Sequence, residues 1–117
     1  MRFALIVLAI ASTLANAQPA ATFETNIGRS ATALRTFDLH SKTRTGLFCD
    51  YGRVIDQVKK DETVQILDYR VVTCGLLRRE HYVRVRRLNT GVPEDSSVGF
   101  VRLEVPDQTK LRLIPSQ

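Results

Sequence analysis

Short stretches of alternating apolar and polar residues run through most of the chain, and this pattern predicts β-strands. It is clearest in residues 81–88, where Val83 and Val85 alternate with polar or aromatic side chains. Successive side chains of a strand point to opposite faces, so this stretch is expected to bury the two valines. Weaker alternation or short apolar runs predict further strands over residues 34–40, 54–58, 63–72 and 98–102, and Leu111 and Leu113 indicate a last strand.

The segments between these strands predict the fold class and one hairpin. Residues 59–62 are a polar turn between 54–58 and 63–72, which are expected to pair with each other, with Val64 and Ile66 in the core. No long amphipathic helical pattern follows residue 17. Five or six short strands therefore predict an all-β domain, either a small barrel or a sandwich that hides its strand edges.

Composition divides the rest of the chain into loops and ends. Residues 18–31 have neither helical nor strand periodicity and are expected to be a flexible lead-in to a domain that covers 32–106. Loops are predicted at 41–53, 73–80 and 89–97, and one helical turn at 103–105, before Pro106. Residues 107–117 are expected to form a tail or an extra strand.

Residues 1–17 are typical of a cleaved signal peptide. Arg2 precedes an apolar run, and the segment ends in Ala15-Asn16-Ala17, which fits a signal-peptidase site. The apolar run is shorter than the roughly 20 residues that a membrane-spanning helix needs, and no second run follows. We therefore expect an exported protein, in the periplasm or secreted, with no transmembrane segment in the mature chain; an uncleaved anchor is the alternative.

Export changes the interpretation of the cysteines. Cys49 and Cys74 are expected to form one intrachain disulfide, because disulfides persist outside the cytoplasm. The alternative readings are free or intermolecular thiols, a catalytic pair with His40 or His81, and a zinc site. The spacing lacks the close ligand pairs of zinc sites, and no local signature of a nucleophile is present. We expect no catalytic residues, no metal and no cofactor.

The net charge of +5, which falls by one when Arg2 leaves with the leader, is mild. The arginines are nevertheless clustered between residues 70 and 87, at positions 70, 78, 79, 84, 86 and 87. Such a cluster predicts a positive face that attracts anionic glycans, lipid head groups, nucleic acid or acidic proteins, or a strand face that is simply solvated.

The order of the segments resembles a bacterial SH3-like domain over residues 37–105. The matching motifs are FDLHS at 37–41, VIDQVKKDETVQIL at 54–67, Tyr82-Val83-Arg84-Val85, and Gly99-Phe100-Val101. Tyr82 and Phe100 stand where the family usually has tryptophan, and Lys42 stands where a glycine usually begins the long first loop. The acidic, tyrosine-rich opening of the proline-binding versions is missing, so polyproline binding is not implied.

This resemblance implies a small SH3-like β-barrel and a non-catalytic adaptor of the bacterial cell envelope. In such a barrel the long first loop lies near the 81–88 strand, and a Cys49–Cys74 bridge would fix its position before a ligand docks. Candidate ligand-binding residues are Tyr51, Tyr82, Arg84 and Arg86, since aromatic and guanidinium groups are frequent at binding hot spots. The alternative is that the two tyrosines pack on the barrel and the two arginines only keep the protein soluble. The expected partner is peptidoglycan or an envelope protein, with no nucleic acid; the alternative function is a secreted inhibitor or effector that binds a protein. The sequence indicates no particular oligomeric state.

Overall fold

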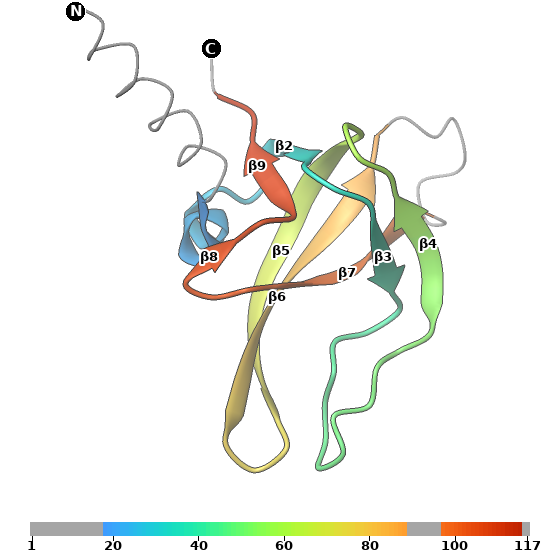
Figure 1. The fold of residues 1–117 in the computed structure, drawn as a ribbon, viewed down its shortest axis with the longest axis vertical. Coiled ribbons are helices and arrows are strands. Elements are labelled where there is room, and N and C mark those ends of the chain that lie inside the picture. Colours follow the sequence, from blue (N-terminus) through green and yellow to red (C-terminus); the bar gives the residue numbers. More distant parts are fainter. Residues whose placement is uncertain (1–17, 89–96, 116–117) are drawn as a thin grey trace, which may run out of the picture.

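A computed structural model describes residues 18–88 and 97–115 of the chain, and these form an antiparallel β-structure (Figure 1). The expected signal peptide and residues 89–96 of the expected loop lie outside the described residues. The elements in chain order are β1 (Gln18–Pro19), the 3₁₀ helix η1 (Ala20–Thr25), β2 (Ser30–Ala33), β3 (Phe37–His40), β4 (Val54–Val58), β5 (Thr63–Cys74), β6 (Arg78–Arg87), β7 (Val98–Leu103), β8 (Asp107–Gln108) and β9 (Leu111–Leu113). The predicted all-β class is confirmed.

One seven-stranded sheet makes up most of the fold. Its strand order is β4-β3-β7-β6-β5-β2-β9, and every neighbouring pair is antiparallel. The centre is the meander β5-β6-β7, while β1 and β8 pair separately. Strands β4 and β9 are the two ends of this order and do not pair with each other, so the described sheet is open.

The expected hairpin between residues 54–58 and 63–72 is wrong, because β4 pairs with β3 and not with β5. The connection between β4 and β5 is instead fastened to β2. The amide of Asp61 donates to the Ala33 carbonyl at 2.8 Å, and the amide of Ala33 donates to the Glu62 carbonyl at 2.9 Å. Asp61 adopts a φ of 73°, which turns the chain sharply. The chain therefore enters β5 beside β2.

Strand β5 forms its hairpin with β6. The ladder extends from Val64 opposite Arg87 to Cys74 opposite Arg78, with a bulge between Ile66 and Asp68. Gly75, at a φ of 71°, supplies the left-handed conformation for the short turn. The loop expected at 73–80 is therefore mostly strand, and the arm reaches well beyond the rest of the sheet (Figure 1).

The core lies on one face of the curved sheet. The alternation predicted for β6 is confirmed there, since Val83 and Val85 are fully buried, as are Val64 and Ile66 on β5. The other buried apolar residues of the core cluster are Ala20, Phe23, Ala31, Ala33, Phe37, Leu39, Val58, Val101, Leu103, Leu111 and Leu113. Gly99 lets β7 approach β3, because a Cβ at this position would lie 2.8 Å from the Cβ of Leu39.

The lead-in expected over residues 18–31 is corrected by the structure, which makes this segment part of the packed fold. Ala20 and Phe23 of η1 are fully buried, and β2 lies between β5 and β9. The helix is too short to show a helical repeat, and two buried side chains are enough to anchor it. Periodicity therefore gave no signal for this segment.

The C-terminal segment also contributes to the core, through the buried side chains of Leu111 and Leu113. Leu111 and Leu113 form β9, so residues 107–117 contain the expected extra strand. The helical turn expected at 103–105 is absent, because Leu103 still belongs to β7 and residues 104–106 form no helix. Within the described residues, no helix is long and apolar enough to cross a membrane.

Replacing Phe23 tests the structural role of η1. Phe23→Ala removes a fully buried aromatic ring and should lower the free energy of unfolding by about 3 kcal/mol. Urea unfolding followed by circular dichroism measures this. Ile27→Ala, at a side chain that is 46 % exposed, is the control and should stay within about 0.5 kcal/mol of the wild type. Equal stability of the two variants would contradict the packing of η1.

Candidate functional site

The long loop over residues 41–53 docks on β6 through a buried carboxylate. Glu80 accepts hydrogen bonds from Arg44 Nε at 3.1 Å and Arg44 Nη2 at 2.9 Å. Arg102 Nη1 on β7 donates to the same carboxylate at 3.0 Å. Because a carboxylate out of water needs such partners, Glu80 ties together the loop, β6 and β7.

Tyr82 lies beneath this loop and is only 1 % exposed. Its hydroxyl donates to Glu80 Oε1 at 2.9 Å and accepts the backbone N–H of Arg44 at 3.1 Å. Burial, together with the Glu80 carboxylate, raises the pKa of Tyr82 to about 12. The expectation that Tyr82 is a surface ligand contact is therefore corrected. Although it points away from Val83, the loop covers it, so both faces of β6 are buried at this level.

The charge of Glu80 is favoured despite its burial. Burial alone would raise the pKa of Glu80, but the Tyr82 hydroxyl and the guanidinium groups of Arg102 and Arg44 outweigh it and lower the pKa. The carboxylate is thus ionised at neutral pH, and the ionised form stabilises the docked loop.

Tyr51 lies on the outer side of the same loop and is 44 % exposed. Its ring stacks on His40 with centroids 4.5 Å apart, and the guanidinium of Arg44 lies 4.9 Å from the ring centroid. His40 in turn makes a hydrogen bond of 3.0 Å between Nδ1 and the Gly52 carbonyl. Tyr51 borders a small hollow of about 170 Å³ together with residues of β3 and β7.

The predicted disulfide between Cys49 and Cys74 is confirmed, with the two Cα atoms 5.0 Å apart. Beside it, the Gly75 amide donates to the Gly46 carbonyl at 2.9 Å. The tip of the long loop is thereby fixed to the β5–β6 turn. A bridged sulfur is not a thiolate, so neither cysteine provides the nucleophile that a Cys–His pair requires.

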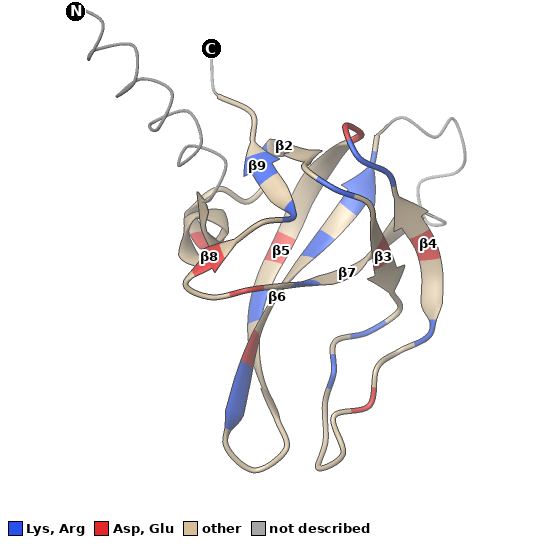
Figure 2. Cartoon of the chain, viewed as in Figure 1, with Lys and Arg blue, Asp and Glu red and all other residues tan. Residues whose placement is uncertain are grey.

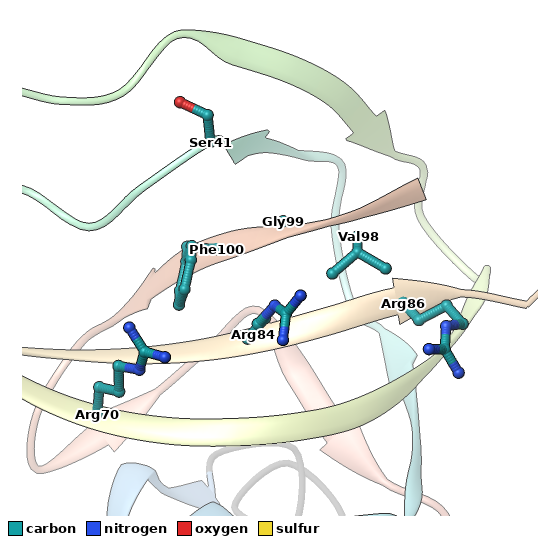
Figure 3. A pocket seen from close by; sticks show the side chains of 7 residues that line it. All are labelled: Ser41, Arg70, Arg84, Arg86, Val98, Gly99 and Phe100. Atoms are coloured by element: carbon teal, nitrogen blue, oxygen red, sulfur yellow. The ribbon is translucent and has the colours of Figure 1, made fainter. Parts of the chain in front are cut away.

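A groove of about 580 Å³ opens on the outer face of the meander, next to the point where the long loop leaves β3 (Figure 3). We call it the basic groove; its lining residues are Ser41, Arg70, Arg84, Arg86, Val98, Gly99 and Phe100. Arg84 on β6 is the register partner of Phe100 on β7, and Arg86 is the partner of Val98. Strand alternation and pairing together therefore place these side chains on one face.

The three guanidinium groups that line the basic groove differ in how many of their N–H donors already have a hydrogen-bond partner. Arg70 Nε bonds Asp68 at 2.9 Å, and its guanidinium carbon lies 5.2 Å from the centroid of the Phe100 ring. The hydrogen bond from Arg70, acting against some burial, lowers the pKa of Asp68 and keeps it ionised. Asp68 thus offsets part of the positive charge.

Arg84 retains more of its donors for a ligand than Arg70 or Arg86 does. Arg84 is exposed and, within residues 18–88 and 97–115, forms no side-chain hydrogen bond or ion pair. Arg86 donates from Nη1 to Gln65 at 3.3 Å, while its buried Nε has no hydrogen-bond partner in the described part of the chain.

The structure thus separates the four sequence-predicted residues. Arg84 and Arg86 both line the basic groove. Tyr51 stacks on His40 at the outer side of the docked loop, and Tyr82 is buried beneath that loop. Arg70 and Phe100 were missed as site residues, because only the β5–β6–β7 register brings them beside Arg84. No family model, no curated protein and no solved structure matches this chain.

The other arginines of the cluster lie outside the basic groove. Arg87 bonds Asp56 of β4 at 2.9 and 3.0 Å and Glu62 at 2.8 Å, which links β6 to the β4–β5 connection. Arg78 and Arg79 lie at the far end of β6. Among the described residues, no group of three or more His, Cys, Asp or Glu side chains could hold a metal ion.

The effect of Glu80→Gln on the free energy of unfolding should depend on pH, because Glu80 is ionised in the folded protein. At pH 7 this change leaves Arg44 and Arg102 without their anion and should lower the free energy of unfolding by about 3 kcal/mol. Because the folded pKa of Glu80 lies below its unfolded value, this stabilisation is complete above about pH 5 and shrinks as pH falls through about 4 towards the folded pKa.

Urea unfolding of wild type and Glu80→Gln between pH 7 and pH 3 measures the difference. Glu24→Gln, at an exposed glutamate, is the control and should follow the wild-type curve. A stability difference that stays constant down to pH 3 would contradict the assignment of Glu80.

Proposed function

We propose that this protein is an exported, non-catalytic binding protein of the bacterial cell envelope that holds peptidoglycan in its basic groove. The observation that carries the proposal is that Arg70, Arg84 and Arg86 line one groove, in which Arg70 lies against the ring of Phe100 and Arg84 is opposite Phe100 in the strand register. The same surface would also serve the alternative, a secreted inhibitor or effector, if its anionic ligand were a protein.

Two features support export. The first is the leader-like pattern of residues 1–17, and the second is the Cys49–Cys74 disulfide, which is compatible with an oxidising compartment. In the chain-entropy model, a bridge across 25 residues stabilises the fold by about 3.5 kcal/mol.

The arrangement of the strands supports a variant of the SH3-like barrel as the fold. A long loop between β3 and β4 lies over the outer face of β6, β5 to β7 form a meander, and β3 pairs with β7. The difference lies at β4, which is an edge strand. Its link to β6 is made by side chains, through Arg87 and Asp56, and no backbone pairing joins it to β5.

The chemistry of the basic groove favours an anionic ligand of small cross-section. Arginine presents a planar fork of donors that matches a carboxylate with two parallel hydrogen bonds. A volume of about 580 Å³ lies within the range of pockets that enclose small ligands, roughly 300–1,000 Å³. The peptide stems of peptidoglycan bring carboxylates next to amino sugars, so one stem could place its carboxylate on Arg84 and its apolar part against Phe100.

Removing the arginines should weaken retention on the cell wall. The double variant Arg84→Ala/Arg86→Ala loses two charged donors, and we expect at least about tenfold weaker binding to purified sacculi. The measurement is co-sedimentation with sacculi at increasing salt, with Lys59→Ala/Lys60→Ala as the control that removes the same charge from an exposed turn. Binding should weaken with salt in the wild type.

The results separate the proposed ligand from its competitors. Equal retention of the arginine variant and the lysine control would overturn the role of the basic groove. Absence of wild-type binding at low salt would overturn peptidoglycan as the ligand. In that case, crosslinking from a photoreactive residue at position 84 in intact cells distinguishes an envelope protein from a released target.

A further inference from the structure

The two turns joined by the disulfide carry four large apolar side chains that face solvent. Leu47 and Phe48 are 62 % and 82 % exposed, and Leu76 and Leu77 are 82 % and 92 % exposed. We call these four residues the apolar tip. Folded proteins avoid gathering such side chains in water unless the patch has a partner.

The apolar tip is held as one unit. Cys49 follows Phe48 directly and bonds Cys74, which lies two residues before Leu76. Gly46 pairs with Cys74 in a parallel β-bridge, and its carbonyl accepts the amides of Cys49 at 3.4 Å and Gly75 at 2.9 Å. Both turns therefore stand at the same end of the molecule, and part of their backbone is already hydrogen-bonded (Figure 1).

Basic side chains lie immediately behind the apolar tip. Arg78 is opposite Cys74 in the ladder and Arg79 is opposite Thr73, and both are exposed. Figure 2 shows basic positions in blue at this end of β6. Across residues 18–88 and 97–115, neither arginine forms an ion pair or a side-chain hydrogen bond. Asp50 is an exposed acid at the same end, while Arg44 is already neutralised by Glu80. The end of the molecule is thus apolar at its extremity and cationic behind it.

We propose that the apolar tip inserts into the interfacial region of an anionic lipid membrane, with Arg78 and Arg79 on the lipid head groups. The order of apolar and cationic groups along the arm matches the order of acyl chains and head groups in a bilayer. This surface is separate from the basic groove, which lies on the outer face of the meander, so the inference does not depend on the proposed function.

Shape and charge favour a membrane over a protein partner as the occupant. The apolar tip projects at the end of a long arm (Figure 1), and Leu76 and Leu77 stand in solvent at 82 % and 92 % exposure. A second copy of this chain would bring Arg78 and Arg79 against the same cations, which repel each other. A lipid surface accepts a projecting apolar group and supplies the missing anions.

Phe48→Trp provides a direct probe, because the chain contains no tryptophan. With vesicles of phosphatidylcholine and phosphatidylglycerol, its emission should shift to the blue and brominated acyl chains should quench it. Vesicles of phosphatidylcholine alone should give weaker binding, and salt should weaken binding to the anionic vesicles. Emission that does not change with saturating anionic vesicles would overturn the proposal.

Variants separate insertion from simple charge attraction. Leu76→Ser/Leu77→Ser should reduce flotation with anionic vesicles at least tenfold, and Arg78→Gln/Arg79→Gln should abolish the preference for anionic over neutral vesicles. Ile27→Ser, at a side chain that is 46 % exposed outside the apolar tip, is the control and should bind as the wild type does. Flotation that survives the loss of Leu76 and Leu77 would overturn insertion.

Two further measurements distinguish the remaining explanations. Arg84→Ala/Arg86→Ala should leave vesicle binding intact; a loss equal to that of the leucine variant would assign binding to the basic groove and overturn the role of the apolar tip. Sedimentation of the wild type without lipid should show a monomer. A dimer that Leu76→Ser/Leu77→Ser dissolves would identify the apolar tip as a contact between copies and overturn the membrane proposal.

Discussion

The buried carboxylate of Glu80 makes the interactions on which the arrangement of the two candidate surfaces depends. An ionised group away from water must be compensated by donors, and here they come from the long loop through Arg44, from β6 through Tyr82 and from β7 through Arg102. These contacts fix the loop at its base, and the Cys49–Cys74 bridge fixes it at its far end. The basic groove and the apolar tip thereby acquire defined positions at opposite ends of the covered part of β6.

Local patterns predicted much of the strand content. Alternation revealed the buried Val83 and Val85, and the short strand predicted over residues 54–58 matched β4. The partners of the strands were harder to predict, because pairing is decided by the turns. In the β4–β5 connection, two backbone bonds to Ala33 direct the chain towards β2, and a short run of sequence carries no sign of that contact.

The candidate site was only partly visible in the sequence for the same reason. Arg84 and Arg86 share a face through alternation alone, whereas Arg70 and Phe100 join them only through a register that includes a bulge after Ile66. Tyr82 was misplaced because alternation tells which side of a strand a residue takes, but not what covers that side. Leu76 and Leu77 are ordinary loop residues by composition, and only the disulfide and the Gly46–Cys74 bridge bring their turn beside the one that carries Phe48.

The two ends of the described chain hold each other in place. Strands β1 and β2 pair with β8 and β9, the Ala20 amide bonds the Pro106 carbonyl at 2.8 Å, and Arg29 reaches the Ile114 carbonyl at 2.7 Å. Contacts this distant in sequence form late, since the intervening chain must first be ordered. The core that contains Phe23 is therefore completed only after Leu111 and Leu113 have left the ribosome. Until β9 has formed, Ala31 and Ala33 of β2 also lack their partners in this strand, so the two ends of the described chain become ordered together.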